Sequence, residues 1–323
     1  MLNDDRANPL NSETPPAGRR PPAGVVIALF AVSSALLFCA RLFVNVRGDW
    51  TPIWHLALEV VFFGLPWALY YQFRPESRSF SRLSAAPKLR TCIAAAIAAL
   101  VGLEYLAGLN TLWLALLLRL GVSLETIRGW MAISLDYNSV LTELLIAAAA
   151  PALFEELLYR GLLLPSLERY GIGRAAVISG ALFALMHLSL PGLPAQLMIG
   201  VPLAMLALAS DSLILPMIYH FTHNASAIIF NNLVRYGAAD IQYETFSRET
   251  MLTASIQTAV SLVLWALLMR VVLLSALRGR GERLAGEESP DRIERIPRGI
   301  TAVIILLILL MSAVYAWQFI ALT

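Results

Sequence analysis

The sequence predicts an all-α, polytopic transmembrane helix bundle of about eight or nine spans with an intramembrane polar cavity. Hydrophobic residues make up 58% of the 323-residue chain, and its mean hydropathy is +0.69. Charged residues make up only 14%, against about 25% in soluble domains. The third observation is a succession of apolar runs, several of which reach the roughly 20 residues that a helix needs to cross a bilayer.

Charge and cysteine content exclude several classes of function. The formal net charge of +2 gives no electrostatic support for a nucleic-acid partner. Cys39 and Cys92 both lie in apolar runs, and two cysteines so placed make neither a disulfide framework nor a CxxC metal pair. Residues 1–23 are polar and rich in Pro, Asn and Arg, so we expect a disordered N-terminal tail.

Apolar segments divide the rest of the chain into three regions. We expect an N-terminal transmembrane scaffold with an interfacial segment at 24–138, a core that carries the polar side chains at 139–234, and C-terminal spans at 235–323. The candidate spans are Gly24–Phe43, Pro52–Tyr71, Cys92–Leu118, Val140–Leu164, Ala175–Leu190, Leu193–Ala209, Ser212–Val234, Met251–Leu273 and Gly299–Ala321.

Basic residues are concentrated in alternate loops, at 74–90, 169–174 and 278–298. The positive-inside rule therefore predicts a cytoplasmic N-terminus and an external C-terminus. On the external side, Leu120–Asn138 has spaced apolar residues typical of an interfacial amphipathic helix.

Two carboxylates and a guanidinium lie close together near the end of the fourth candidate span. Each charged group near the bilayer centre costs roughly 2.5–3.5 kcal/mol, so the cluster predicts a functional site. Glu156 and Arg160 are i, i+4 neighbours that can pair. Glu155 is rotated by about 100° from Glu156 and is assigned as the reactive carboxylate. The alternative is a helix end that has reached the interface, with Arg160 extending to water.

Two later segments add imidazole groups. His187 follows Phe183 by one helical turn, and a lone histidine on an apolar helix is more often a packing residue. His220 and Asn224 share one helix face, which favours a functional role over hydrogen bonding between helices. For His223 we favour hydrogen bonding between helices.

Glu104 and Glu143 also interrupt apolar runs. We interpret each as a neutral carboxylic acid that is hydrogen-bonded to a neighbouring helix.

Taken together, these groups favour hydrolysis. A carboxylate and a histidine can hold and deprotonate a water, while a histidine and an amide can donate hydrogen bonds to an oxyanion. That set suits amide hydrolysis without a covalent intermediate. Glu155, His187 and His220 would also suit zinc, with the fourth position left for water. The sequence contains no Gly-x-Ser-x-Gly, no His-Glu-x-x-His and no phosphate-binding loop.

The motifs resemble those of the type II CAAX prenyl endopeptidases, whose bacterial members form the CPBP or Abi group of intramembrane proteases, linked to bacteriocin processing and self-immunity. The three ordered motifs are Glu155-Glu156-x-x-x-Arg160, Phe183-x-x-x-His187 and His220-x-x-x-Asn224.

The resemblance implies that region 139–234 is catalytic, in a protein of the bacterial plasma membrane. Glu155 and His187 would activate water, His220 and Asn224 would stabilise the oxyanion, and the other motif residues would support them. The substrate would be a membrane-associated or lipidated polypeptide. Because the family has been described both as metal-dependent and as glutamate-dependent, zinc stays open.

Two other functions stay open: a non-enzymatic scaffold or bacteriocin-immunity protein that keeps the motif residues for structure, and a transporter or proton relay. The expected depths also conflict. Helical rise places Glu155 about 22 Å from the outer end of its span but His187 only about 4–5 Å from the outer end of its own. The two meet only if the fifth span is tilted, starts deeper or continues past Pro191.

Overall fold

The computed structural model describes residues 19–43, 50–123, 139–237, 247–283 and 294–320, and all regular structure in these ranges is helical. This confirms the all-α prediction. Five stretches are long and apolar enough to cross a membrane. The prediction of eight or nine spans is not confirmed. The five stretches are Ala23–Ala40, Thr51–Phe73, Leu89–Arg119, Leu193–Ser210 and Arg248–Glu282.

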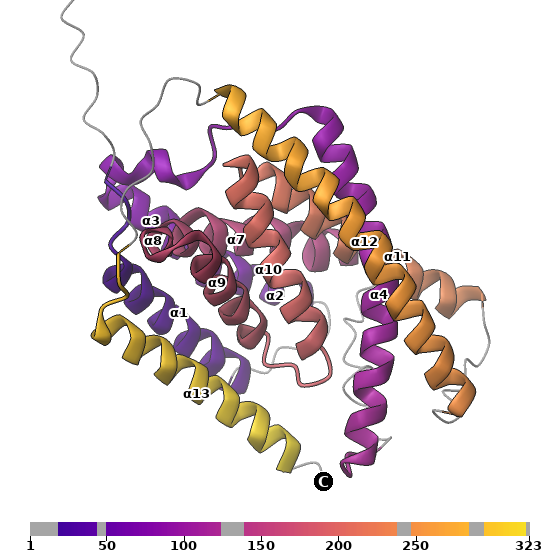
Figure 1. Ribbon diagram of the computed structural model, residues 1–323. Coiled ribbons are helices and arrows are strands. Elements are labelled where there is room, and N and C mark those ends of the chain that lie inside the picture. Colours follow the sequence, from indigo (N-terminus) through magenta and orange to yellow (C-terminus); the bar gives the residue numbers. More distant parts are fainter. Residues whose placement is uncertain (1–18, 44–49, 124–138, 238–246, 284–293, 321–323) are drawn as a thin grey trace, which may run out of the picture.

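The helices follow one another as shown in Figure 1. The longer ones are α1 (Ala23–Phe43), α4 (Leu89–Arg119), α9 (Ile172–Met186), α10 (Leu193–Ser210), α11 (Ile214–Gly237), α12 (Arg248–Arg283) and α13 (Arg298–Ile320). The shorter pieces are α2 (Thr51–Glu59), η2 (Val60–Gly64), α3 (Leu65–Phe73), η3 (Pro75–Ser81), α6 (Val140–Glu143), η4 (Leu144–Ala149), α7 (Ala150–Leu158), η5 (Tyr159–Leu163), α8 (Leu164–Leu167) and η6 (Glu168–Tyr170).

Three prolines explain why two of the helical paths are divided into pieces. Pro66, Pro151 and Pro165 each lie at the start of an α-helical piece that directly follows a π-helical turn. Proline lacks an N–H and its ring clashes with the carbonyl four residues earlier. The wider π turn accommodates that clash, and such turns are frequent at functional sites.

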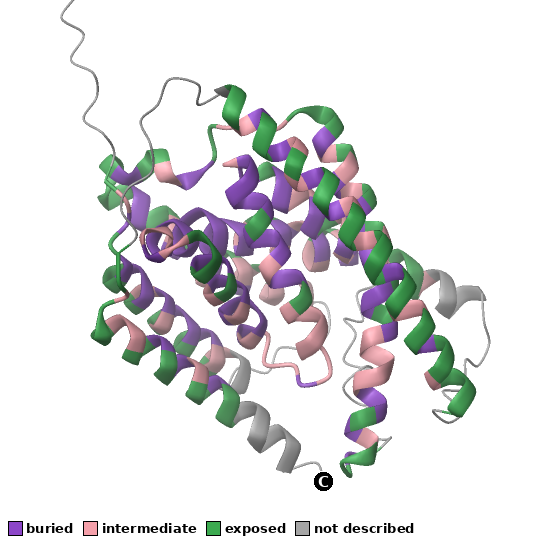
Figure 2. Cartoon of the chain, in the orientation of Figure 1, coloured by how far each residue is buried: buried purple, intermediate pink, exposed green. Residues whose placement is uncertain are grey.

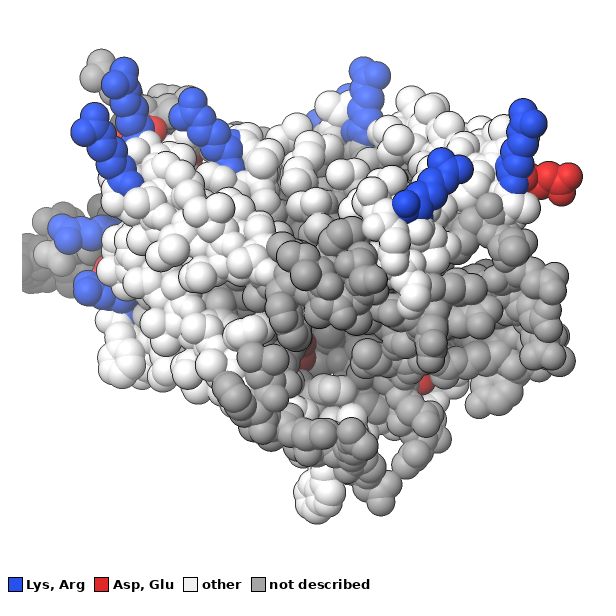
Figure 3. Space-filling view, turned by 90° about the horizontal axis from the view of Figure 1, so that it is seen from below, with Lys and Arg blue, Asp and Glu red and all other residues white. Residues whose placement is uncertain are grey.

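The helices that carry the motif residues lie in the middle of the bundle. Figure 2 shows α7, which carries the two carboxylates, and α9, which ends just before His187, mostly buried, whereas α12 and α13 expose long outward faces. Side by side, α1 and α13 form one flank in Figure 1, and α4 pairs with α12 on another. On the face seen in Figure 3, Lys and Arg side chains project from the margin and most of the described surface is uncharged. This pattern is typical of an integral membrane protein.

The buried side chain of Arg82 connects the turns between helices at one end of the bundle. Arg82 donates hydrogen bonds to Glu168, to Asp211 at 3.1 Å and to the carbonyl of Arg160 at 3.1 Å. Burial by itself lowers the pKa of Arg82, but the carboxylates of Glu168 and Asp211 more than offset this and leave the pKa raised. Arg82 therefore stays charged and fixes the helix that carries the motif carboxylates.

Several local expectations can be compared with the structure. Glu104 accepts a hydrogen bond from Gln257 of α12 at 2.8 Å, and Glu143 accepts one from Asn232 of α11 at 2.7 Å. The expected hydrogen bonds to neighbouring helices are thus confirmed. Most of the proposed interfacial helix at 120–138 lies outside the described residues.

The fifth candidate span, Ala175–Leu190, was placed wrongly along the chain. The helix α9 starts at Ile172, directly after Gly171 with its φ of 106°, and ends at Met186. It cannot continue because Leu188 adopts φ 50° and the Pro191-Gly192 turn follows. At 15 residues it is about 22 Å long, shorter than a bilayer core of about 30 Å.

Candidate active site

The position of α9 brings Glu155 and His187 to the same depth. The chain reverses at Gly171, and both residues lie 16 positions from it (171 − 155 and 187 − 171). In an antiparallel helical hairpin, residues equidistant from the turn lie opposite each other when the two arms have a similar mean rise per residue; here the π-helical turn η5 and the 3-10 turn η6 deviate from the α-helical rise in opposite directions. Glu155 Oε1 accordingly lies 4.0 Å from His187 Nε2. The apparent depth conflict came from treating the fifth span as a complete crossing, whereas α9 is shorter than a bilayer core.

Glu156 of α7 is linked to two other helices, directly to α11 and through Arg160 to α10. Its Oε1 accepts hydrogen bonds from Arg160 Nη1 at 2.8 Å and from His220 Nδ1 of α11 at 2.9 Å. Arg160 Nη2 also donates to the carbonyl of Gly200 in α10 at 2.9 Å. The side chains of Glu156 and Arg160 are completely buried. A buried ion pair needs such additional hydrogen bonds to offset its desolvation, and these contacts also fix the orientation of His220.

Glu155 faces both imidazoles from a different side of the same helix. Its Oε2 lies 3.9 Å from His220 Nε2, and the contact between its Oε1 and His187 has a similar length. Because the Phe183 carbonyl can only accept, His187 Nδ1 carries the proton in its 2.8 Å hydrogen bond to that oxygen. In the neutral rings, the Nε2 lone pairs of His187 and His220 therefore face the carboxylate.

The separations of about 4 Å are too long for direct hydrogen bonds but suit a bridging water. A water about 2.8 Å from each atom of such a pair subtends an angle of roughly 90°. It can donate one hydrogen to Glu155 and the other to an imidazole Nε2. Its lone pairs then stay available for an electrophilic carbon.

Phe183 holds the cluster together from one side. The centre of its ring lies 4.6 Å from the Arg160 guanidinium carbon, 4.8 Å from the His187 ring and 5.7 Å from the His220 ring. Tyr159 packs edge-on against Phe183, with ring centres 5.2 Å apart. A cation over an aromatic face is favourable in a dry environment, so this contact supports the predicted role of Phe183.

Asn224 and His223 have a less direct relation to the cluster of Glu155, His187 and His220. The Asn224 amide donates to the carbonyl of Ala147 at 3.2 Å, one turn beyond His220 on α11. One amide hydrogen thus stays available for another acceptor. His223 is buried, and its Nδ1 has no hydrogen-bond partner in the described part of the chain. The structure therefore gives His223 no hydrogen bond between helices through that atom.

The geometry of this cluster does not match a preformed zinc site. With ligand atoms about 2.0–2.1 Å from zinc, tetrahedral coordination places neighbouring ligand atoms roughly 3.4 Å apart. The two separations from Glu155 are 4.0 and 3.9 Å. No group of three His, Cys, Asp or Glu within the described ranges is arranged to hold a metal ion.

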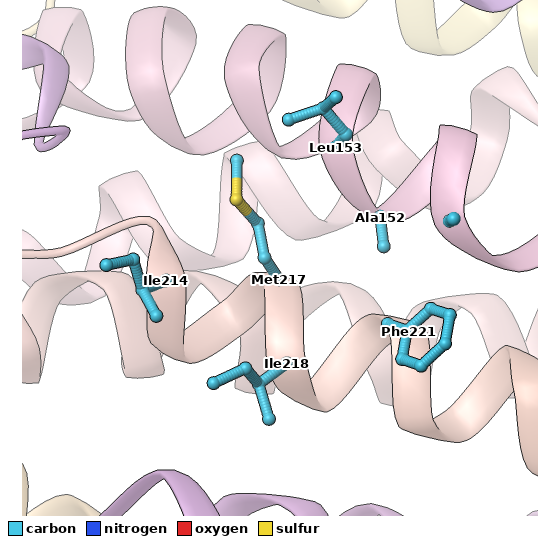
Figure 4. A pocket seen from close by; sticks show the side chains of 7 residues that line it. Ala152, Leu153, Ile214, Met217, Ile218 and Phe221 are labelled. Atoms are coloured by element: carbon cyan, nitrogen blue, oxygen red, sulfur yellow. The ribbon is translucent and has the colours of Figure 1, made fainter. Parts of the chain in front are cut away.

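An apolar pocket of about 320 Å³ lies between α7 and α11, the two helices that carry Glu155 and His220. In Figure 4, Met217 of α11 extends toward the α7 segment that carries Ala152 and Leu153, and Phe221 lies farther along α11. Ala152 precedes Glu155 by three residues and Phe221 directly follows His220. An apolar group held here would thus lie next to the helices that carry the carboxylate and an imidazole.

One supporting feature was not identified from the sequence. The helices α9 and α10 cross at Gly180 and Gly200, where a Cβ built on Gly200 would lie 2.5 Å from the Gly180 carbonyl oxygen. This crossing places the Gly200 carbonyl that accepts from Arg160. The spacings Gly180-x-x-x-Ala184 and Gly200-x-x-x-Ala204 follow the small-xxx-small pattern of closely packed membrane helices and could have revealed it.

Residues 137–226 match the family model of Rce1-like type II CAAX prenyl endopeptidases. The matched segment contains the three motifs and the whole cluster described above. Comparisons with curated proteins and with solved structures found no match. The family match agrees with the resemblance of the motifs and supports a peptidase in the membrane.

Proposed function

We propose that the chain is an intramembrane endopeptidase that hydrolyses a peptide bond of a membrane-associated or lipidated polypeptide. The observation that supports this proposal best is the arrangement of Glu155 against two imidazole Nε2 atoms, at 4.0 and 3.9 Å. Each imidazole is held in place through its Nδ1 by a different acceptor. A carboxylate with a fixed imidazole on each side can hold a water and accept its proton.

In the proposed reaction, Glu155 takes a proton from a water that is also held by His187. The resulting hydroxide attacks the substrate carbonyl carbon, and the carbonyl π pair moves to oxygen. His220, protonated at Nε2 while Glu156 holds its Nδ1–H, and the second amide hydrogen of Asn224 would donate to that oxyanion. The tetrahedral species collapses as the C–N bond breaks, and Glu155 returns the proton to the leaving amine.

The polypeptide would reach the site from the bilayer side. The pocket between α7 and α11 has almost wholly apolar walls and lies between the helices that carry Glu155 and His220, so an apolar substrate segment fits it better than a hydrated one does. The bilayer itself would then concentrate and orient the substrate.

The decisive experiment measures proteolysis by the purified protein in liposomes that contain single-span and lipid-anchored peptides, with products identified by mass spectrometry. Glu155→Gln should retain the fold and lose at least about a hundredfold in cleavage, the usual contribution of a general base. Glu104→Gln is the matched control because Glu104 is also a helix carboxylate, but bonded to Gln257 of α12. Full activity of Glu155→Gln would remove that carboxylate from the mechanism.

The same preparation separates the remaining hypotheses. Loss of cleavage after chelation, restored by zinc, would favour Glu155, His187 and His220 as metal ligands after rearrangement. Normal biological activity of alanine variants at these three positions would favour a scaffold or immunity protein. Solute uptake by the liposomes would favour a transporter.

A further inference from the structure

A second, polar pocket lies where α4 begins and α12 nears its end, far along the chain from the peptidase motifs. Its volume is about 320 Å³, and Arg90 of α4 lines it together with Val271, Leu274, Ser275 and Arg278 of α12. Unlike the pocket between α7 and α11, it combines two guanidinium groups with an apolar wall. No step of the proposed peptidase reaction uses it.

The lining residues of α12 are arranged by depth along one face. Positions 271, 274, 275 and 278 follow an i, i+3, i+4, i+7 pattern and so form a single stripe. Arg278 lies about 10 Å along the helix from Val271 on a rise of 1.5 Å per residue. The stripe therefore passes from apolar side chains to a charged one, as the bilayer does between its acyl chains and its headgroups.

The two helices are fixed to each other at this pocket. Thr91 and Ser275 share a hydrogen bond of 2.7 Å between their hydroxyl oxygens, and Lys88 pairs with Glu282 one turn beyond Arg278. The guanidinium groups of Arg90 and Arg278 consequently project from a closely packed pair of helices. The helix packing therefore fixes the backbone positions from which the two arginine side chains extend.

Neither guanidinium forms an ion pair with another of the described residues. Both arginines are exposed, in contrast to Arg82 and Arg160, which are buried and bonded to carboxylates. Two exposed guanidinium groups beside an apolar wall create a positive site for a planar or tetrahedral oxyanion.

We infer that this pocket binds an anionic phospholipid, with the headgroup phosphodiester between Arg90 and Arg278 and an acyl chain along Val271 and Leu274. A lipid satisfies both halves of the pocket, whereas a free phosphate would leave the apolar half unfilled. Basic pockets between membrane helices near a charged membrane face bind lipid headgroups in the same way.

Native mass spectrometry of the delipidated protein in detergent tests this inference, with phosphatidylglycerol and phosphatidylcholine as probes. The double variant Arg90→Gln/Arg278→Gln should bind phosphatidylglycerol about tenfold to thirtyfold more weakly, from roughly 1 kcal/mol per basic residue. The matched control is Arg119→Gln/Arg248→Gln, which removes equal charge from the opposite ends of the same two helices. It should bind like the unaltered protein.

Three results would overturn the inference. The first is that the Arg90/Arg278 variant binds phosphatidylglycerol as tightly as the unaltered protein does. The second is that the unaltered protein binds phosphatidylcholine as tightly as phosphatidylglycerol. The third is that inorganic phosphate displaces phosphatidylglycerol at a comparable concentration. The melting temperature of each variant shows whether it is folded. If the double variant unfolds, Arg278→Gln alone should still weaken binding by about fivefold.

Discussion

Replacing Gly200 with alanine should push α9 and α10 apart and weaken the hold on Arg160. The new Cβ would lie 2.5 Å from the Gly180 carbonyl oxygen, a backbone atom that no rotamer change can move away. Restoring ordinary contact at about 3.4 Å needs a shift of roughly 0.9 Å. Starting from 2.9 Å, a shift of that size directed away from Arg160 would lengthen the Arg160–Gly200 distance to about 3.8 Å, too long for a hydrogen bond.

We expect this change to cost about 1–3 kcal/mol in the free energy of unfolding, as overpacking usually does. Cleavage should fall further, to about one-hundredth in kcat with little change in KM, because a displacement near 1 Å can have that effect on aligned catalytic groups. Unfolding in detergent mixtures, followed by tryptophan fluorescence, measures the first quantity. The liposome cleavage assay measures the second.

The matched control is Gly173→Ala in α9, where an added Cβ meets nothing within 4 Å. Because glycine in an open helix position is disfavoured relative to alanine, this variant should gain up to about 1 kcal/mol and keep full activity. If Gly200→Ala and Gly173→Ala behave alike in both assays, the close crossing of α9 and α10 does not position the site.

Three further predictions concern the buried polar contacts of Glu156, Arg82 and Tyr71. Glu156→Ala leaves the Arg160 guanidinium buried without its carboxylate and should lower the free energy of unfolding by about 3–5 kcal/mol. In the same unfolding assay, a double variant that also removes Arg160 should lose less than the sum of the two single changes. Arg82→Gln should lower the melting temperature by a similar amount at every pH between about 6 and 10, since a raised arginine pKa keeps the stabilising charge until the pH passes that pKa. Tyr71→Phe removes the 2.7 Å hydrogen bond to the Gly161 carbonyl and should cost about 0.5–1.5 kcal/mol, measured by thermal unfolding.

Periodicity and charge in the sequence were enough to predict the helical class and the different directions in which the two adjacent carboxylates point. The i, i+4 spacing correctly paired Glu156 with Arg160, and the 100° rotation correctly pointed Glu155 elsewhere. Span ends were predicted less well, because runs of apolar residues continue through turns such as the one after His187. The contact between Glu156 and His220 depends on packing between distant segments, which no local pattern specifies.

The structure suggests that chain length, more than side-chain preference, sets the depth of the proposed catalytic pair. Because Glu155 and His187 lie on the two arms of a hairpin, equally far from Gly171, their alignment depends on where that turn occurs. His220 comes from a third helix and has no such constraint from the chain. It is held instead by Glu156, the carboxylate next to Glu155, so that a single turn of helix orients His220 and also faces His187. This explains how adjacent carboxylates can have separate roles: one fixes the geometry, and the other is left facing both imidazoles.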